Sequence, residues 1–173
     1  FDQGEIMPLQ IVIDAKNDQL LEAKNLSALD KISSELTKIE GVAKVRSVIM
    51  PTGDINQSPF KVSNQLNNFQ DQTQAIAEKM TTPAGLGEIK GNNFASINSY
   101  LDSLSSSYPE VKDENSFKEA KTILGTLSVQ MQNTSASALN DPALSNLQSS
   151  FLKLSQDFKS LTTIFSKKPN AYL

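Results

Sequence analysis

The hydrophobic pattern of the first 56 residues predicts a strand, a helix and a second strand. Residues 9–15 carry apolar side chains at alternate positions and are rich in β-branched residues, which is typical of a β-strand. Residues 42–50 show the same alternation, and the turn-forming sequence Pro51-Thr52-Gly53 follows directly after them. The period of two in both segments predicts two strands that each place one face against a core.

The segment between these strands has the start and stop signals of a helix. Ser27 and Asp30 have the spacing of an acidic capping box, and Gly41 is placed as the glycine that ends a helix. The apolar residues expected on the buried face recur at intervals of three and four: Leu29, Ile32, Leu36 and Ile39. Residues 1–56 are therefore predicted to form a compact β-α-β unit.

From residue 57 onward the hydrophobic period is helical throughout. Apolar residues recur at alternating intervals of three and four, and the predicted helices cover about residues 60–80, 93–107, 114–133 and 141–167. This spacing is typical of near-parallel, coiled-coil-like packing, so we expect a long antiparallel helical hairpin or bundle.

The fold class expected from both halves is α+β and mostly helical. Residues 1–56 form a small β-α-β base, and residues 57–173 form a helical insertion that ends in the start of a further strand at 171–173. The neutral polar residues Ser, Asn, Gln and Thr support this division, because they make up 58 of the 173 residues but only 12 of the first 56.

Composition excludes several classes of function. The chain has no His and no Cys, which excludes a Ser-His-Asp triad, a Cys-His dyad, a thiolate redox site and a zinc finger. The net charge is −3 and no segment concentrates positive charge, which argues against a nucleic-acid partner. No apolar run approaches the roughly 20 residues that cross a bilayer. The chain begins without an initiator Met or a signal peptide, so we expect it to derive from a longer protein.

Three short motifs resemble functional sites, but each has a simpler explanation. The glycines of residues 85–91 follow a predicted helix instead of a strand, which favours a hinge over a phosphate-binding loop. Asp54 and Asn56 lack the later ligands of a calcium loop. The densest group of carboxylates, which fits a solvated helix start better than a cation site, is Glu110, Asp113 and Glu114. We therefore predict no enzyme activity, no catalytic residue, no cofactor and no metal site.

The last helix contains the most prominent candidate for a binding surface. Phe151, Phe158 and Phe165 recur every seven residues, and their rings supply more apolar volume than a two-helix seam requires. Ordinary helix–helix packing accounts for such a stripe. The second interpretation is a groove that binds a lipid or a hydrophobic ligand, or a stripe that docks a partner.

The order of short motifs in the first third of the chain resembles a known family. The matching elements are Phe1-Asp2-Gln3-Gly4, Pro8, the strand 9–15, a helix that ends Ile39-Glu40-Gly41-Val42, the pair Val45 and Ser47, and Pro51-Thr52-Gly53. This order is similar to the start of an extracytoplasmic porter domain in MmpL-like transporters of the RND superfamily. Similar transporters of Gram-positive bacteria carry long helical insertions after this unit.

The resemblance implies a function and a set of partners. The intact protein would be a proton-driven membrane exporter, and this chain would be its first loop domain on the extracellular side of the cell membrane. The base would be a split, ferredoxin-like β-α-β arrangement, incomplete here, whose two parallel strands need a third strand between them. The partners would be the transmembrane helices and the rest of the same polypeptide, together with a lipid or amphiphilic compound as cargo.

Two other classes of function fit the same pattern. A structural or adhesive cell-surface module would use the helices as a spacer or as a rod that self-associates into a homo-oligomer. A ligand-sensing ectodomain of a receptor also uses long helices, although the β-α-β unit fits it less well.

Overall fold

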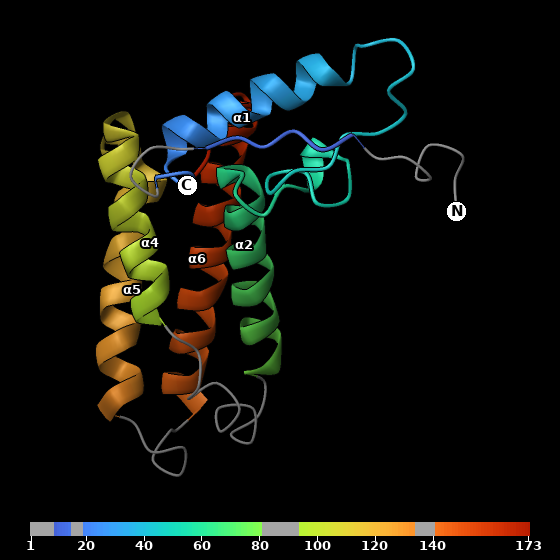
Figure 1. Cartoon of the computed structure of the whole chain (residues 1–173). Helices are drawn as coiled ribbons and strands as arrows, with labels where there is room; N and C mark the ends of the chain where they lie inside the picture. Colours follow the sequence, from blue (N-terminus) through green and yellow to red (C-terminus); the bar gives the residue numbers. More distant parts are fainter. Residues whose placement is uncertain (1–8, 15–18, 81–93, 134–140) are drawn as a thin grey trace.

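The computed structural model describes residues 9–14, 19–80, 94–133 and 141–173, and these residues are mostly helical, as the sequence predicts. Four long helices form a bundle: α2 (Val62–Lys79), α4 (Phe94–Ser107), α5 (Asn115–Asn133) and α6 (Asp141–Ser166). The helices α2 and α5 run in one direction and α4 and α6 in the other (Figure 1). A fifth helix, α1 (Ala23–Leu36), lies across one end of this bundle (Figure 1).

The bundle helices lie inside the ranges that the hydrophobic spacing predicts. The helix α2 occupies most of the predicted range 60–80, and α4 most of 93–107. The breaks between helices also have local causes. The short 3-10 helix η3 (Pro109–Asp113) separates α4 from α5, and a proline at its first position is compatible with a helix start because that position needs no amide donor.

The helix α6 is the central element of the bundle because it packs on both α2 and α5. Small side chains let α2 and α6 approach closely: Thr73 and Ala77 on α2 and Ser155 on α6 are all buried. The Ser155 hydroxyl donates to the carbonyl of Gln70 at 3.2 Å, and the amide of Gln148 donates to the carbonyl of Ala77 at 3.1 Å. Ser155 and Gln148 are thus hydrogen-bonded to the facing backbone, and the Thr73 hydroxyl donates to carbonyls of its own helix, which limits the cost of burying these groups.

The base differs from the sequence prediction at the start of its helix. Ser27 lies inside α1, one turn after the helix begins at Ala23, so it is not the capping residue that the S-x-x-D spacing predicts. Glu22 occupies the N-cap position, and its side chain makes no capping hydrogen bond. The helix extends to earlier residues because Leu26 is fully buried, and burial of this side chain outweighs the loss of a local cap.

The two strands of the predicted base are not shown in the structure. Residues 9–14 and 42–46 have no regular secondary structure, and the described part of residues 42–50 contains only an isolated bridge between Ser47 and Met50. That bridge closes a tight turn through two backbone hydrogen bonds of 3.0 and 3.3 Å. A single extended segment gains no ladder hydrogen bonds by itself, and these two segments do not pair with each other, so neither is held as a strand.

The final residues form a strand-like pairing whose partner is the segment just before α2. Tyr172 makes an antiparallel bridge with Lys61. The amide of Val62 donates to the carbonyl of Ala171 at 3.0 Å, and the amide of Leu173 donates to the carbonyl of Phe60 at 3.0 Å. The predicted strand start at 171–173 therefore pairs at the junction between base and bundle. Tyr172 packs its side chain into the core of the base, so the last residues of the chain contact the base as well as the bundle. The division into domains at residue 57 stays a prediction.

Candidate functional site

The phenylalanine stripe of α6 lies inside the bundle. The side chains of Phe151, Phe158 and Phe165 are at most 1 % exposed. Each ring contacts an aromatic ring from another helix or helix end: Phe151 contacts Phe94, Phe158 contacts Phe69, and Phe165 contacts Tyr108, with ring centroids 5.7, 5.7 and 5.2 Å apart.

These contacts explain why the stripe carries rings instead of smaller side chains. The rings of α6 fill the space between several helices, and tilted or edge-on arrangements at these distances are favourable. In the described structure the three rings offer no surface to solvent, so they serve as core side chains. Their role toward a lipid or another hydrophobic ligand stays a hypothesis that requires the bundle to open.

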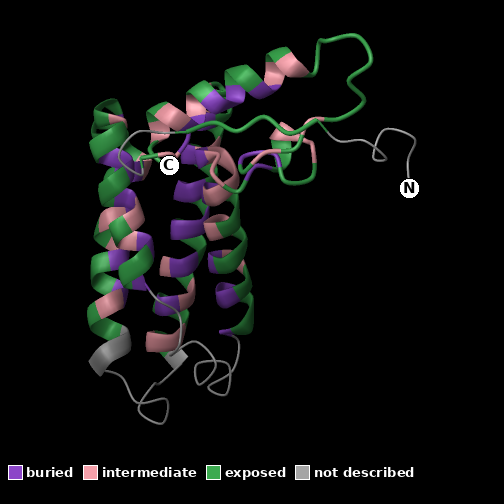
Figure 2. Ribbon diagram, in the orientation of Figure 1, coloured by how far each residue is buried: buried purple, intermediate pink, exposed green. Residues whose placement is uncertain are grey.

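The exposed apolar side chains are concentrated in the base. Of the eleven large hydrophobic residues that are exposed in the described structure, nine precede residue 49. We call these nine the apolar base residues: Leu9, Ile11, Val12, Ile13, Leu21, Ile32, Ile39, Val42 and Val48. Figure 2 shows that buried positions line the inside of the bundle, and that exposed positions lie on its outer faces, on α1 and on the segment beside α1. Single exposed hydrophobics are common on proteins, but such a concentration in one part of a chain marks a candidate docking surface.

The sequence pattern predicts burial of two of these residues, one on α1 and one beyond its C-terminal end. Ile32 and Ile39 belong to the predicted buried stripe, but they are 42 % and 54 % exposed. On α1 the structure buries Leu29, as the stripe predicts, and it also buries Leu26 and Ser33. The Ser33 hydroxyl lies 3.4 Å from that of Ser47. The helix has apolar residues on more than one face, so periodicity alone does not decide which face packs on the neighbouring segment.

The base has only a small core of its own. Its buried hydrophobic residues are Leu26, Leu29, Ile49, Met50 and Tyr172, with Ile55 and Phe60 partly buried against them. The hydroxyl of Tyr172 is buried in this cluster, and its pKa is raised, first by burial and then by the negative charge of Asp30. A core of this size covers one side of α1 and leaves the apolar base residues without a covering layer.

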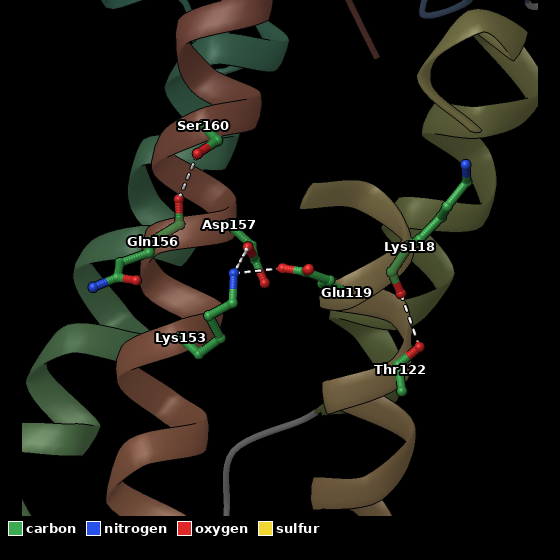
Figure 3. A network of polar contacts seen from close by, with 7 residues as sticks. All are labelled: Lys118, Glu119, Thr122, Lys153, Gln156, Asp157 and Ser160. Atoms are coloured by element: carbon green, nitrogen blue, oxygen red, sulfur yellow. Dashed lines mark hydrogen bonds and ion pairs between the residues drawn. The ribbon is translucent and has the colours of Figure 1, made fainter. Parts of the chain in front are cut away.

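A polar network links α5 to α6 (Figure 3). Lys153 on α6 pairs with Asp157 one turn later at 2.8 Å, and it also pairs with Glu119 on α5. Asp157 is buried, and its second carboxylate oxygen, Oδ2, has no hydrogen-bond partner among the described residues. Burial raises the pKa of Asp157; Lys153 opposes this rise, and the charge of Glu119 adds to it. The sequence signals only the Lys153–Asp157 spacing, because nothing local indicates that Asp157 faces the core.

The weaker candidate motifs have ordinary structural roles where the structure describes them. The Asp54 carboxylate accepts from the amide of Asn56 at 2.9 Å and caps the short 3-10 helix η2 (Ile55–Gln57). Glu110 pairs with Lys168 from the end of α6. The backbone carbonyl of Asp113 accepts from Lys118 at 3.1 Å. Glycines 85–91 lie outside the described residues.

Within residues 9–14, 19–80, 94–133 and 141–173, no three acidic side chains are grouped so that they could hold a metal ion together. The helices in those ranges include none with both the length and the apolar character needed to span a bilayer.

Comparison with known proteins gives no relative from which a function can be transferred. No family model, no curated protein and no solved structure matches this chain.

Proposed function

We propose that this chain is an extracellular loop domain of a proton-driven, MmpL-like exporter of the RND superfamily, and that it docks onto the rest of the same polypeptide through its base. The observation that carries the proposal is the unequal distribution of exposed apolar surface. The bundle buries its stripes within itself, whereas the base leaves nine large apolar side chains exposed. A base that is covered by another part of a larger protein accounts for this difference.

The split β-α-β fold belongs to the same proposal. In such a fold the two parallel strands are not neighbours, and a strand from elsewhere lies between them. The segments 9–14 and 42–46 carry strand-like sequences, and no backbone hydrogen bond joins them in the described structure. An inserted strand would supply the missing ladder on both sides.

Docking is favoured over direct binding of cargo by the bundle. A lipid that reached the three phenylalanines would have to displace their ring contacts with three other elements. The passage of a lipid or amphiphilic compound is therefore assigned to the assembled transporter, in which the base forms part of the wall. A titration of the isolated chain with a fluorescent lipid tests this, since saturable binding that Phe158→Ala abolishes would favour a groove in the bundle.

Single-cysteine crosslinking in the intact gene product tests the docking proposal directly, because this chain has no cysteine of its own. Val12 is 91 % exposed, so Val12→Cys places a thiol on the base with little structural cost. Ser160→Cys places a matched thiol on the exposed face of α6. We expect a bifunctional crosslinker to join the thiol of the Val12→Cys variant to another segment of the same polypeptide. The thiol of the Ser160→Cys variant should form no such crosslink.

Two outcomes would contradict the proposal. Crosslinks from the Val12→Cys thiol to a second copy would favour the alternative of a self-associating cell-surface module, and sedimentation of the intact protein as a stable oligomer would support that alternative. A gene product without hydrophobic segments of about 20 residues flanking this region would exclude a transporter.

The alternative of a self-associating cell-surface module draws support from the closed bundle and its Ser-, Asn- and Gln-rich outer face.

A further inference from the structure

The contact between α5 and α6 contains two carboxylates that compete for one lysine. Lys153 is half exposed and reaches across to Glu119 of α5, which is also half exposed. The same Nζ lies 2.8 Å from Oδ1 of Asp157, which is one turn further along α6. The side chain of Asp157 is only 3 % exposed. With both carboxylates ionised, the group carries a net negative charge at a site where one oxygen of Asp157 is buried and has no partner in the described part of the chain.

We propose that Glu119, Lys153 and Asp157 form a pH-responsive contact that holds α5 more firmly against α6 when the surrounding solution is acidic. The proposal concerns the bundle alone and does not depend on the exporter assignment. It rests on the arrangement in Figure 3, where both carboxylates converge on the same ammonium group from different helices.

Protonation of Asp157 changes how Lys153 is shared. A neutral Asp157 no longer attracts the ammonium group, so Lys153 is left to its partner on α5. The contact within α6 weakens and the contact between the two helices strengthens. Protonation also removes the cost of burying a carboxylate with an unsatisfied oxygen, which is large in a site of low dielectric constant.

The other charged groups nearby do not compensate Asp157. Figure 3 shows the side chain of Lys118 directed away from the network, and its ammonium donates to the carbonyl of Asp113. On α4, Asp102 pairs with Lys121 of α5 at 2.7 Å. The charged residues of α2, the other helix packed on α6, lie at exposed positions: Asp71, Glu78 and Lys79. Glu119 and Lys153 are thus the charged groups that the described structure places against Asp157.

The sign of the pH effect follows from the direction in which the fold shifts Asp157. Burial raises its pKa in the folded protein above the value of about 3.9 for an unfolded chain. Between these two values the folded state binds an extra proton, so this group adds stability as the pH falls through its folded pKa. The gain is complete below the unfolded value. Glu119 behaves oppositely, because Lys153 lowers its pKa and keeps it ionised as the pH falls.

A carboxyl-carbon NMR titration of the unmodified chain is the first test, since it needs no variant that might misfold. We expect Asp157 to titrate above about pH 4, the ordinary Asp value. Amide hydrogen exchange, corrected for the intrinsic rate at each pH, gives the second readout. The protection of α5 should rise as the pH is lowered in the unmodified chain.

Three variants separate the proposed device from a general effect of acid. In Asp157→Asn the amides of α5 should be protected from exchange at every pH as strongly as they are at low pH in the unmodified chain, because the neutral amide has the shape of the protonated acid. Glu119→Gln should abolish the rise, because α5 loses its ionised partner. Asp71→Asn, which removes an exposed carboxylate from α2, should leave the rise intact. The proposal is overturned if Asp157 titrates at or below the ordinary value, or if Asp157→Asn responds to pH as the unmodified chain does.

Discussion

Tyr108 and Tyr172 are joined by two hydrogen bonds that connect the end of α4 to the last residues of the chain. The Tyr108 hydroxyl accepts from the backbone amide of Tyr172 at 2.9 Å and donates to the backbone carbonyl of the same residue at 3.0 Å. The side chain of Tyr172 continues into the core of the base, beside Leu26 and Met50. The position of the base on the bundle therefore depends on how firmly Tyr108 holds this backbone.

The Tyr108 hydroxyl is expected to contribute measurably to stability. Tyr108→Phe removes the partner of both backbone groups of Tyr172, so we expect the free energy of unfolding to fall by about 1–3 kcal/mol. Tyr100→Phe, on α4 just before this tyrosine, is the matched control, because the buried Tyr100 hydroxyl has no hydrogen-bond partner in the described structure. That change should be neutral or stabilising in denaturant unfolding. Equal losses in both variants would refute the proposed role of Tyr108.

Hydrogen exchange gives a second readout for the same pair. In Tyr108→Phe the amide of Tyr172 loses its acceptor and should exchange faster, together with the paired amide of Leu173. The amides in the middle of α6 should be unaffected. Uniform acceleration along α6 would mean that the substitution loosens the whole bundle and not the junction.

The stripe of α6 predicts a large difference between buried and exposed side chains of the same helix. Phe158 is fully buried against Phe69, so Phe158→Ala should cost about 3–5 kcal/mol by removing apolar contacts and leaving a cavity. The control on the same helix is Leu152, which is 37 % exposed, and Leu152→Ala should cost far less. Thermal or urea unfolding of both variants measures the difference. A small loss in Phe158→Ala would indicate that the interior is loosely packed and accessible to ligands.

The helical part of the fold follows from the sequence because its signals are redundant. In α6, a start at Asp141-Pro142, an unbroken stripe and an end near Lys167 all agree. The stripes of α2, α4 and α5 have similar spacing, and mutual burial is the stable arrangement for helices with narrow apolar faces. Which stripe residues face which helix is not encoded locally, and the contact of Phe69 with both Tyr100 and Phe158 needs the tertiary structure.

The base is less predictable because its sequence is compatible with more than one packing partner. Residues 9–14 and 42–46 have strand-like composition, but a strand requires a neighbour to pair with, and neither segment is paired with another among the described residues. The network of Glu119, Lys153 and Asp157 could not be predicted from the sequence for a different reason. Asp157 looks like an ordinary surface residue in the sequence, and its burial depends on how α6 rotates between α2 and α5.

The two faces of α1 give a test of the corrected packing. Leu29 is 7 % exposed, so Leu29→Ala should destabilise the chain by about 2–5 kcal/mol. Ile32 is 42 % exposed, so Ile32→Ala should be close to neutral in the isolated chain, and alanine also favours the helix. If the base docks onto another segment, Ile32→Ala should instead lower the stability of the intact protein. Similar losses of stability for both variants in the isolated chain would support the packing that the sequence stripe predicts, with both residues buried.

Two glycines of the base separate the effect of backbone conformation from that of a steric contact. Gly41 and Gly53 both have positive φ angles, +87° and +83°, where an L side chain is strained by about 1–2 kcal/mol. A Cβ at position 41 would meet open space, whereas one at position 53 would lie 2.8 Å from Cγ of Lys44. We expect Gly53→Ala to cost more than Gly41→Ala in denaturant unfolding.

A double-mutant cycle with Lys44→Ala assigns the extra cost at position 53. Lys44 is exposed, so Lys44→Ala alone should change the free energy of unfolding very little. In the Lys44→Ala background the penalty of Gly53→Ala should fall to that of Gly41→Ala, because only the strain of the left-handed backbone remains. If the penalty stays the same, the Lys44 side chain yields without cost, and the turn after residues 42–50 is limited by its backbone alone.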